Sequence, residues 1–416
     1  MKLTPTLVEQ IRQQYPAFTR TVGGLPAAFF DGPGGTQVPQ CVIDAVSHYL
    51  GHTNSNHGGL FATSIESDAI LDQAHRAMAD FLGTDDPGTI VFGPNMTSLA
   101  MALGRSLGRT WTRGDEIIVT RLDHDANVAS WLLAAEDAGA TVRFVDIDPT
   151  DCTLNLEQLR EQINPATKWV AVGCASNVSG SLNPISEISN WAHEVGALVF
   201  ADAVHLAPHL LLDVEQLGCD FLACSPYKFF GPHLGVLWGR RELLESLPVY
   251  KVRPAVNTLP DRWMTGTQSH ENIAGALAAV NYLADLGRLV SDDSTLPRRS
   301  ALREAFVAIA EYESALTLGF LEQIDQLRQY HIWGIQDRDR LSQRLPTISF
   351  THNSMSPDEL TANLAERGLF LWQGNHYASE LCEALGQPEG AVRAGIVHYN
   401  TLDEVNRLAA ALRELA

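Results

Sequence analysis

The sequence predicts an α/β fold in which a mostly parallel, seven-stranded sheet is covered by helices on both faces. From about residue 85 to 240, short apolar runs alternate with segments of helical periodicity. Continuous apolar strands joined by helices are typical of parallel sheets buried on both faces. Strands are expected at 89–92, 116–120, 141–147, 168–174, 197–201, 221–224 and 235–238, and helices at 97–107, 126–138 and 185–195. In such a sheet a ligand binds at the carboxyl ends of the strands.

The remaining segments predict how the chain is divided. Residues 1–20 form a short amphipathic helix that is expected to pack with a small C-terminal domain, and residues 21–290 form the large, ligand-binding domain. An exposed loop at 290–300 and a helix at 301–330 open the small α/β domain, which spans 291–416. Strands at 346–352, 369–373 and 392–400, with helices from 356 and from 402, complete that domain.

The composition is that of an ordinary globular protein, with 416 residues, 45% of them hydrophobic and 19% charged. The formal net charge of −20 argues against nucleic acid and anionic membranes as partners, because both bind basic surfaces. No apolar run of the roughly 20 residues that cross a bilayer is expected, and the N-terminus does not resemble a signal peptide. A cytoplasmic protein is therefore expected. Six scattered cysteines without zinc-ligand spacing predict no structural metal.

Two charged residues follow buried apolar strands. Asp202 ends the run ALVFAD, where an isolated carboxylate is costly, so it either pairs with a cation or caps the next helix. Lys228 lies in SPYKFFGP, among three aromatic residues and between two apolar strands. Burial lowers the pKa of a lysine and gives the neutral amine that Schiff-base chemistry requires. The alternative is a surface lysine that extends from a turn.

Two further segments offer binding groups at the same edge of the sheet. The strand in VFGPNMTS is followed by a helix start at Asn95, Met96 and Thr97, whose free N–H groups suit a phosphate. His124, just past the strand in EIIVTRLDH, is placed to stack on a planar ring. Either segment alone also fits an ordinary helix start.

Together the lysine, the aspartate, the helix start and the histidine match the needs of pyridoxal 5′-phosphate (PLP). This cofactor requires an amine for its aldehyde, a partner for its pyridinium nitrogen, a phosphate cradle and a planar stack. The sequence has no GxGxxG after a strand and no GxxxxGK[ST], which disfavours a nicotinamide dehydrogenase and a P-loop enzyme.

Nearly the whole chain, from FFDGPGGTQVP (29–39) to VRAGIVHYNTLDEV (392–405), resembles the class V aminotransferase family of fold-type I PLP enzymes, and within it the cysteine desulfurase/selenocysteine lyase branch. The resemblance implies that Lys228 holds PLP as a Schiff base, that Asp202 pairs with the pyridine nitrogen and that His124 stacks on the ring. These three are the expected catalytic residues. The other cofactor-binding residues that it implies are Asn95, Met96, Thr97, Asn177, His205, Ser225, Tyr227 and Thr267.

The same resemblance implies details of the cofactor's surroundings. Ser225 would contact the phosphate, and Tyr227 stands where a histidine often does so. His205 replaces the glutamine that usually touches the phenolic oxygen. Thr267, in TGTQ, would reach the phosphate of a neighbouring subunit, which implies a homodimer with shared sites.

The substrate implied by the resemblance is a small amino acid. Arg393 of VRAG matches the arginine that binds the substrate's carboxylate, a task suited to its two-pronged guanidinium. Asn177 of ASNVSG would lie near that carboxylate, and His376 and Tyr377 are the further substrate-binding residues expected.

One departure from the family changes the expected chemistry. In desulfurases a loop cysteine takes up the substrate's sulfur as a persulfide, but QGNHYASELC places Tyr377 there, and a phenol cannot form a persulfide. We therefore expect C–S or C–Se cleavage by elimination, without a protein persulfide. Transamination, α-epimerisation, a desulfurase that uses Cys382 and a non-catalytic protein of the same fold are the alternatives. The sequence identifies no sulfur-acceptor protein.

Overall fold

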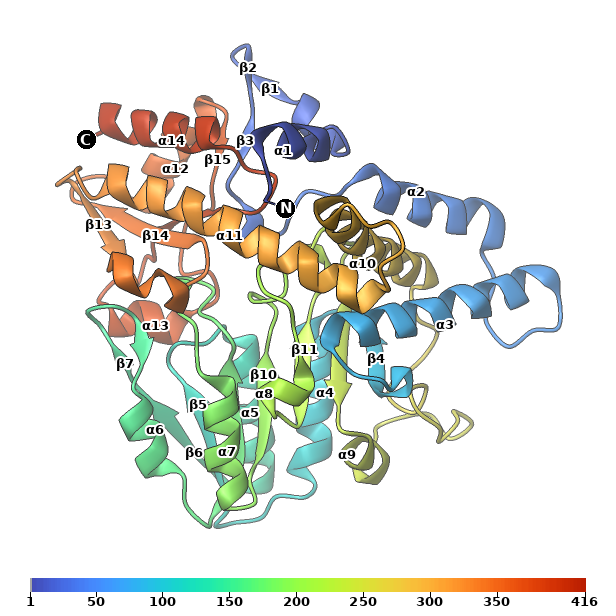
Figure 1. The fold of residues 1–416 in the computed structure, drawn as a ribbon. Coiled ribbons are helices and arrows are strands. Elements are labelled where there is room, and N and C mark those ends of the chain that lie inside the picture. The colour runs from blue at the N-terminus through green and yellow to red at the C-terminus, as the bar shows by residue number, and fades with distance from the viewer. Residues whose placement is uncertain (1) are drawn as a thin grey trace.

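The computed structural model describes residues 2–416 and has a seven-stranded sheet at its centre (Figure 1). The strands lie in the order β4 (Ile90–Gly93), β12 (Gly235–Gly239), β11 (Phe221–Cys224), β10 (Leu198–Asp202), β9 (Thr167–Gly173), β5 (Glu116–Thr120) and β6 (Thr141–Val145). Neighbouring strands are parallel except at β12, which is antiparallel to both β11 and β4. The predicted fold class is confirmed.

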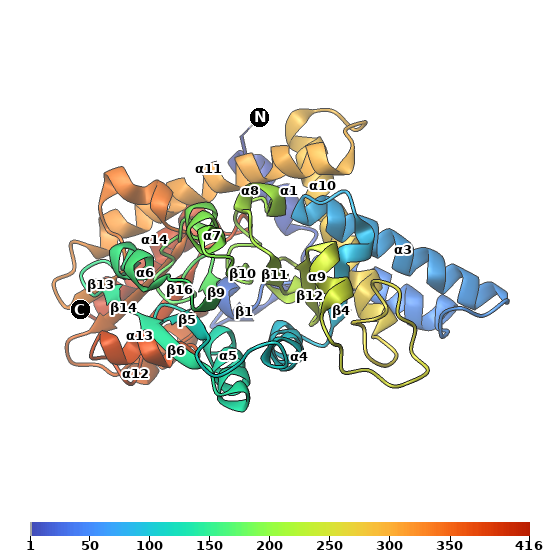
Figure 2. The same ribbon diagram turned by 90° about the horizontal axis from the view of Figure 1, so that it is seen from below.

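Helices cover both faces of this sheet, as Figure 2 shows. On one face lie α4 (Met96–Gly108) and α5 (Ala126–Ala138); on the other lie α7 (Ile185–Glu194), α3 (Ala62–Leu82) and α10 (His270–Ser291). Along β9, Trp169 and Ala171 enter one hydrophobic core, and Val170 and Val172 enter the other. Because both faces are buried, the strands are continuously apolar, which is the pattern that predicts them.

The C-terminal part is built on a second, smaller sheet. Its antiparallel strands are β13 (Tyr330–Trp333), β14 (Thr347–His352) and β16 (Val392–Gly395), packed with α11 (Arg298–Ile324), α12 (Pro357–Glu366) and α14 (Leu402–Glu414). The N-terminal helix α1 (Pro5–Arg12) lies close to it, since Arg12 Nη2 is 2.8 Å from Glu404 Oε1. The proposed domain boundaries stay a prediction.

Two expected strands are shorter than predicted. The segment 369–373 contains only β15 (Leu369–Phe370), which pairs in parallel with β3 (Ala28–Phe29). The strand expected at 392–400 ends at Gly395, where the chain turns toward α14. Both expectations rested on apolar runs; beyond β15 only an isolated bridge between Trp372 and Arg393 continues the pairing, and residues 396–400 are buried outside any strand.

Within the described residues, α10 is the one helix long and apolar enough to cross a bilayer by length and composition. Its most apolar window is 67% buried inside the protein. That burial is typical of a core helix, so the finding is weak evidence for a membrane span. The expected cytoplasmic location stays a prediction.

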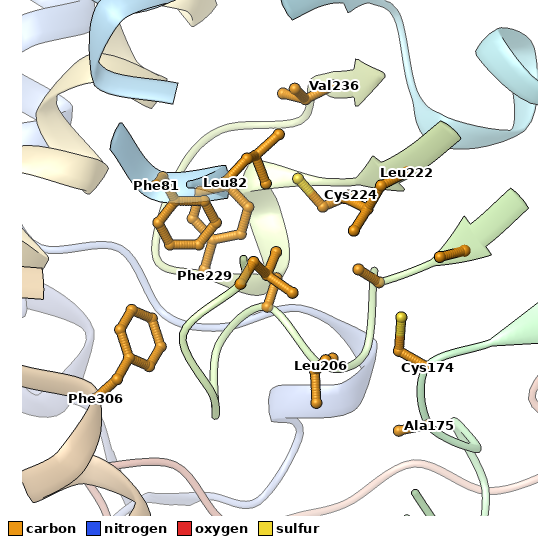
Figure 3. Packing of buried hydrophobic residues seen from close by; sticks show 14 of the residues in the cluster. Phe81, Leu82, Cys174, Ala175, Leu206, Leu222, Cys224, Phe229, Val236 and Phe306 are labelled. Carbon is orange, nitrogen blue, oxygen red and sulfur yellow. The ribbon is translucent and has the colours of Figure 1, made fainter. Parts of the chain in front are cut away.

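The loop after β11 is anchored in the larger core, as Figure 3 shows. Phe229 is completely buried and stacks on Phe81 of α3, with ring centroids 4.6 Å apart; Phe81 in turn lies 6.0 Å from Phe306 of α11. The residue just before Phe229 is therefore held at a fixed place at the carboxyl edge of the sheet. That residue is Lys228.

Candidate active site

A cavity lies at the carboxyl ends of β5, β9, β10 and β11, where the fold class predicts a ligand site. All of the predicted cofactor-binding residues except Thr267 line it: Asn95, Met96, Thr97, His124, Asn177, Asp202, His205, Ser225, Tyr227 and Lys228. The structure thus brings together residues that are spread over more than a hundred positions of the sequence.

Lys228 ends a short 3-10 turn, Pro226–Lys228, and is mostly buried in the cavity wall. Its Nζ donates a hydrogen bond to the carbonyl oxygen of Pro33 and lies 5.0 Å from the centre of the Tyr227 ring. Burial, and then the positive charge of Arg393, lower the pKa of Lys228 to about 7, with Asp202 opposing the shift. A large fraction of this amine is therefore neutral near pH 7.

Asp202 is the last residue of β10 and is 8% exposed. Its Oδ1 accepts a hydrogen bond from the backbone N–H of Val204 at 2.9 Å. Turns follow it, and the next helix, α8 (Val214–Leu217), is capped by Asp213, so Asp202 is not a helix cap. Burial raises the pKa of Asp202 to about 6, against the lowering effects of the Val204 N–H and of the nearby charge of Lys228. A carboxylate so placed suits a cationic partner in the cavity.

The start of α4 forms another wall. Asn95 is the N-cap residue, and its side chain accepts from Ser98 N at 2.8 Å, which leaves the N–H groups of the first helical residues, Met96 and Thr97, without helical partners. A Cβ at Gly235 would lie 2.3 Å from the Asn95 carbonyl carbon, so only glycine allows β12 to approach this turn. The geometry suits an anion such as a phosphate.

His124 lies against a second aromatic ring. Its centroid is 5.6 Å from that of Tyr377, with an interplanar angle of 25°. Nδ1 accepts from Ala126 N at 3.0 Å, so the proton of the neutral ring is on Nε2. Burial, and then the charges of Lys228 and Arg393, lower the pKa of His124 to about 4. The ring is therefore neutral at physiological pH.

His205 lines the cavity near the end of β10 and is 5% exposed. Its Nε2 is 3.0 Å from Thr347 Oγ1, on the first strand residue of β14. Burial lowers the pKa of His205 well below its ordinary value. The other ring nitrogen, Nδ1, is the one that remains for a ligand in the cavity.

Arg393 of β16 comes from the smaller sheet and is 4% exposed. Its Nη1 donates to the carbonyl oxygen of Asn177 at 2.7 Å, but its Nε is buried without a partner, and so is Oδ1 of Asn177. Burial lowers the pKa of Arg393 to about 9, which still leaves it charged at pH 7. A buried donor of this kind fits a carboxylate that arrives with a ligand.

The loop that carries His376 and Tyr377 closes over this edge of the site. Both residues have left-handed backbone angles, φ 54° and 56°. The His376 carbonyl accepts from Asn177 Nδ2 at 2.9 Å, and the Tyr377 carbonyl accepts from Asp125 N at 2.6 Å. His376 Nε2 is 3.0 Å from the carbonyl oxygen of Ala391. The Tyr377 side chain is 74% exposed, so it covers His124 from the solvent side.

Cys382 does not line the cavity. It lies in α13 (Ser379–Ala384), is 3% exposed, and its Sγ is 3.7 Å from the carbonyl oxygen of Asn375. Burial raises the pKa of the Cys382 thiol to about 11, so it is protonated at pH 7. No cysteine is among the described residues that line the cavity.

Thr267 is the predicted cofactor-binding residue that does not line the cavity; the predicted substrate-binding residues Arg393, His376 and Tyr377 do not line it either. Thr267 is exposed in the loop before α10, and the neighbouring Gln268 only bonds within that loop. Its expected role lies in the site of a second subunit, so that role stays a prediction.

Asp123 lines the cavity but was not predicted as a site residue. It is 4% exposed, and its Oδ1 accepts from Gly173 N at 2.8 Å. The sequence signal was a second carboxylate directly beside His124, at a strand end.

The residues present fit PLP. The amine of Lys228 has a lowered pKa, Asp202 offers a buried carboxylate, and the start of α4 offers free N–H groups on the cavity wall. Set at the strand ends of this sheet, they define a PLP-dependent enzyme of fold type I.

The chain belongs to the class V aminotransferase family. The sequence model described as "Aminotransferase class-V" matches residues 28–296 and 300–408. The resemblance inferred from the motifs is confirmed, and so is PLP as the cofactor.

Similar proteins of this family are named as cysteine desulfurases. A cysteine desulfurase of Enterobacter sp. (strain 638) is 30% identical over 423 residues, covering 98% of each chain. A probable cysteine desulfurase of Synechocystis sp. is 28% identical and covers 97% of this chain and 94% of the relative. The structure of the Escherichia coli cysteine desulfurase CsdA (S-sulfonic acid) aligns with a TM-score of 0.83 at 25% identity, covering 98% of each chain. The apo cysteine desulfurase of Thermococcus onnurineus NA1 has the same fold, with a TM-score of 0.87 at 24% identity over 98% of this chain and 97% of that one.

Proposed function

We propose that this cysteine desulfurase-like enzyme is a lyase. It cleaves the bond between the β-carbon and sulfur, or selenium, of a small L-amino acid, without storing the released atom on a protein cysteine. The observation that carries the proposal is the composition of the site: no cysteine lines the described cavity, and the loop over it presents Tyr377.

The chain's own residues divide the work at the cofactor. PLP, when bound, supplies an aldehyde for the substrate's amino group and a ring that takes up electrons from the α-carbon. Lys228 anchors it and then, as a neutral amine, removes the α-proton. The anionic Asp202 holds the proton on the ring nitrogen, and His124 supports the ring face.

Other residues hold the two ends of the complex. The N–H groups of Met96 and Thr97, with Asn95, Ser225 and Tyr227, bind the phosphate in this proposal. His205 replaces glutamine at the phenolic oxygen. At the other end, the unpartnered Nε of Arg393 and the side chain of Asn177 receive the substrate's carboxylate, with His376 and Tyr377 above it. These contacts fix the α-carbon beside Lys228.

The proposed reaction balances without an oxidant or a thiol. Lys228 takes the α-proton, the electron pair forms a Cα–Cβ double bond, and the Cβ–S bond breaks with both electrons leaving on sulfur. L-cysteine and water then give pyruvate, ammonia and hydrogen sulfide. A desulfurase differs because a thiol attacks the sulfur and the carbon skeleton leaves as alanine.

A desulfurase that uses Cys382 is the second candidate, because the similar proteins are named as cysteine desulfurases. It requires α13 to open, since Cys382 is buried and its pKa is raised to about 11. That structural cost favours the lyase.

We also infer a homodimer with shared sites. Exposed apolar side chains cluster on α2 (Gln40–His48), the following turn and the start of α3: Ile43, Leu50, Leu60, Phe61 and Ile65. Apolar clusters of this kind mark protein interfaces. Light scattering coupled to gel filtration tests the assembly.

A substrate screen tests the proposed activity. The holoenzyme is incubated with cysteine, cystine, selenocysteine and related amino acids, and pyruvate and sulfide or selenide are quantified. Equal amounts of pyruvate and sulfide are expected from at least one of them. Absence of pyruvate with every one of these amino acids would sink the proposal, and stoichiometric conversion of the cofactor to its amine form would instead indicate transamination.

A further inference from the structure

Asp123 and Asp202 are two buried carboxylates on the wall of one cavity. Asp123 follows β5 and Asp202 ends β10, and β9 lies between these strands. Gly173, at the end of β9, is paired in register with Asp202 and donates its N–H to Asp123 Oδ1 at 2.8 Å. A Cβ at position 173 would lie 2.5 Å from that oxygen, so glycine permits the approach.

A buried chain of side chains fixes the orientation of Asp123. Asn127 Nδ2 donates to Asp123 Oδ2 at 3.1 Å, and Trp131 Nε1 donates to Asn127 Oδ1 at 2.9 Å. Asn127 and Trp131 are both 0% exposed and lie in the first and second turns of α5. The hydroxyl of Thr120 also hydrogen-bonds the Asp123 carboxyl group and lowers its pKa against the effect of burial.

The charges around the pair are unequal. Asp202 accepts a hydrogen bond from a backbone N–H and lies near the positive charge of Lys228. Both contacts lower its pKa, against the effect of burial. Asp123 has no comparable cation: burial, and then the negative charge of Asp202, raise its pKa to about 8 although Gly173, Thr120 and Asn127 hydrogen-bond it and act in the opposite direction. Ionising both of two buried carboxylates on one cavity wall is costly, and the cation of Lys228 beside Asp202 favours placing the proton on Asp123. The other titratable or charged groups around the pair are His124, His205, Tyr227, Lys228 and Arg393, with the buried thiols of Cys174 and Cys224.

We propose that Asp123 is a positioning residue that holds a proton beside Asp202, so that Asp202 alone presents a negative charge to the ring nitrogen of the cofactor. Asp123 acts through Asp202 and does not itself touch the reacting atoms. The inference rests on the cofactor-facing role proposed for Asp202. A protonated Asp123 is neutral, whereas an ionised Asp123 would be a costly second buried charge.

Infrared spectroscopy of the holoenzyme without substrate tests the proposal. Near neutral pH the wild type is expected to show the C=O stretch of a buried, protonated carboxyl group. Asp123→Asn should lose this band, Asp123→Glu should keep a shifted one, and the control Asp125→Asn should leave it unchanged. Asp125 is exposed, lies two residues away and makes no side-chain cap.

The visible absorbance of the bound cofactor gives a second readout. At neutral pH Asp123→Asn should match the wild type, because asparagine copies the neutral acid. In alkaline solution the wild type gains a charge that the variant cannot, so the midpoint of the absorbance transition should lie about one pH unit lower in Asp123→Asn. A wild type without the protonated-carboxyl band, or a neutral-pH spectrum altered in Asp123→Asn but not in Asp125→Asn, would overturn the proposal. If Asp123→Asn does not fold, the wild-type band and its shift in Asp123→Glu decide. Neither readout uses substrate, so failure here is distinct from failure of the lyase assignment.

Discussion

The ring of Tyr377 lies 5.6 Å from the ring of His124, nearly parallel to it, in the loop where the family's desulfurases are expected to carry their sulfur-accepting cysteine. The loop is held there by backbone contacts to Asn177 and Asp125. Position 377 therefore lies beside His124 at the rim of the site, and it carries a phenol.

Replacing this side chain is expected to change the products. In Tyr377→Cys, a thiol stands beside the site and can attack the substrate's sulfur, so alanine should form from L-cysteine when a reducing thiol is present. Amino-acid analysis measures alanine against pyruvate. Tyr377→Phe, which keeps the ring stack but adds no thiol, is the control and should form no alanine. An unchanged product ratio in Tyr377→Cys would mean that the loop does not present position 377 to the sulfur.

Removing the amine of Lys228 is expected to abolish covalent attachment of the cofactor. The visible absorbance of the purified protein should disappear in Lys228→Ala, and borohydride should no longer fix PLP to the chain. Lys168→Ala is the matched control, because Lys168 lies at the opposite, amino end of β9. Persistence of reducible, bound cofactor in Lys228→Ala would place the anchor elsewhere.

Arg393→Ala is expected to weaken substrate binding by about 2–5 kcal/mol, the cost of breaking a buried charge pair. The readout is the substrate concentration dependence of the spectral change, taken with a melting curve to verify folding. Arg393→Lys should recover only part of the loss, because an ammonium group does not form the two-pronged contact. Equal affinity in wild type and Arg393→Ala would remove this residue from carboxylate binding.

The activity is expected to fall on the acid side of neutrality. Protonation of Lys228, with a pKa lowered to about 7, removes the base; protonation of Asp202, with a pKa raised to about 6, removes the charge that faces the ring nitrogen. Both losses act in the same direction, so the rate should drop as pH falls through this range. A pH profile of pyruvate formation, with circular dichroism to verify folding, is the measurement. A rate that stays flat from about pH 8 to about pH 5 would contradict these roles.

Much of the large sheet could be predicted from the sequence because its strands are buried on both faces. β5 and β11 have the expected bounds, and the others differ by a residue or two. The separate pairing of β15 was harder to predict, since its partner is a distant two-residue strand, β3, whose sequence carries no periodicity. Such pairing is decided by tertiary contacts that a local pattern does not contain.

The site was predicted in part for a physical reason. Strand ends of one sheet converge, so Lys228 and Asp202 could be placed together from their positions alone. Arg393 could not, because it comes from another sheet, and only the family resemblance indicated it. Asp123 was missed because the strand order that sets it beside Asp202 depends on tertiary contacts, which a local sequence pattern does not contain.

The most direct test of the lyase assignment compares the products of the wild type with those of Cys382→Ser. Both proteins are given L-cysteine and a reducing thiol, and pyruvate, alanine and sulfide are quantified together. We expect pyruvate equal to sulfide, little alanine, and no change in Cys382→Ser. Alanine as the main product, lost in Cys382→Ser, would show instead that the enzyme is a desulfurase that uses that cysteine.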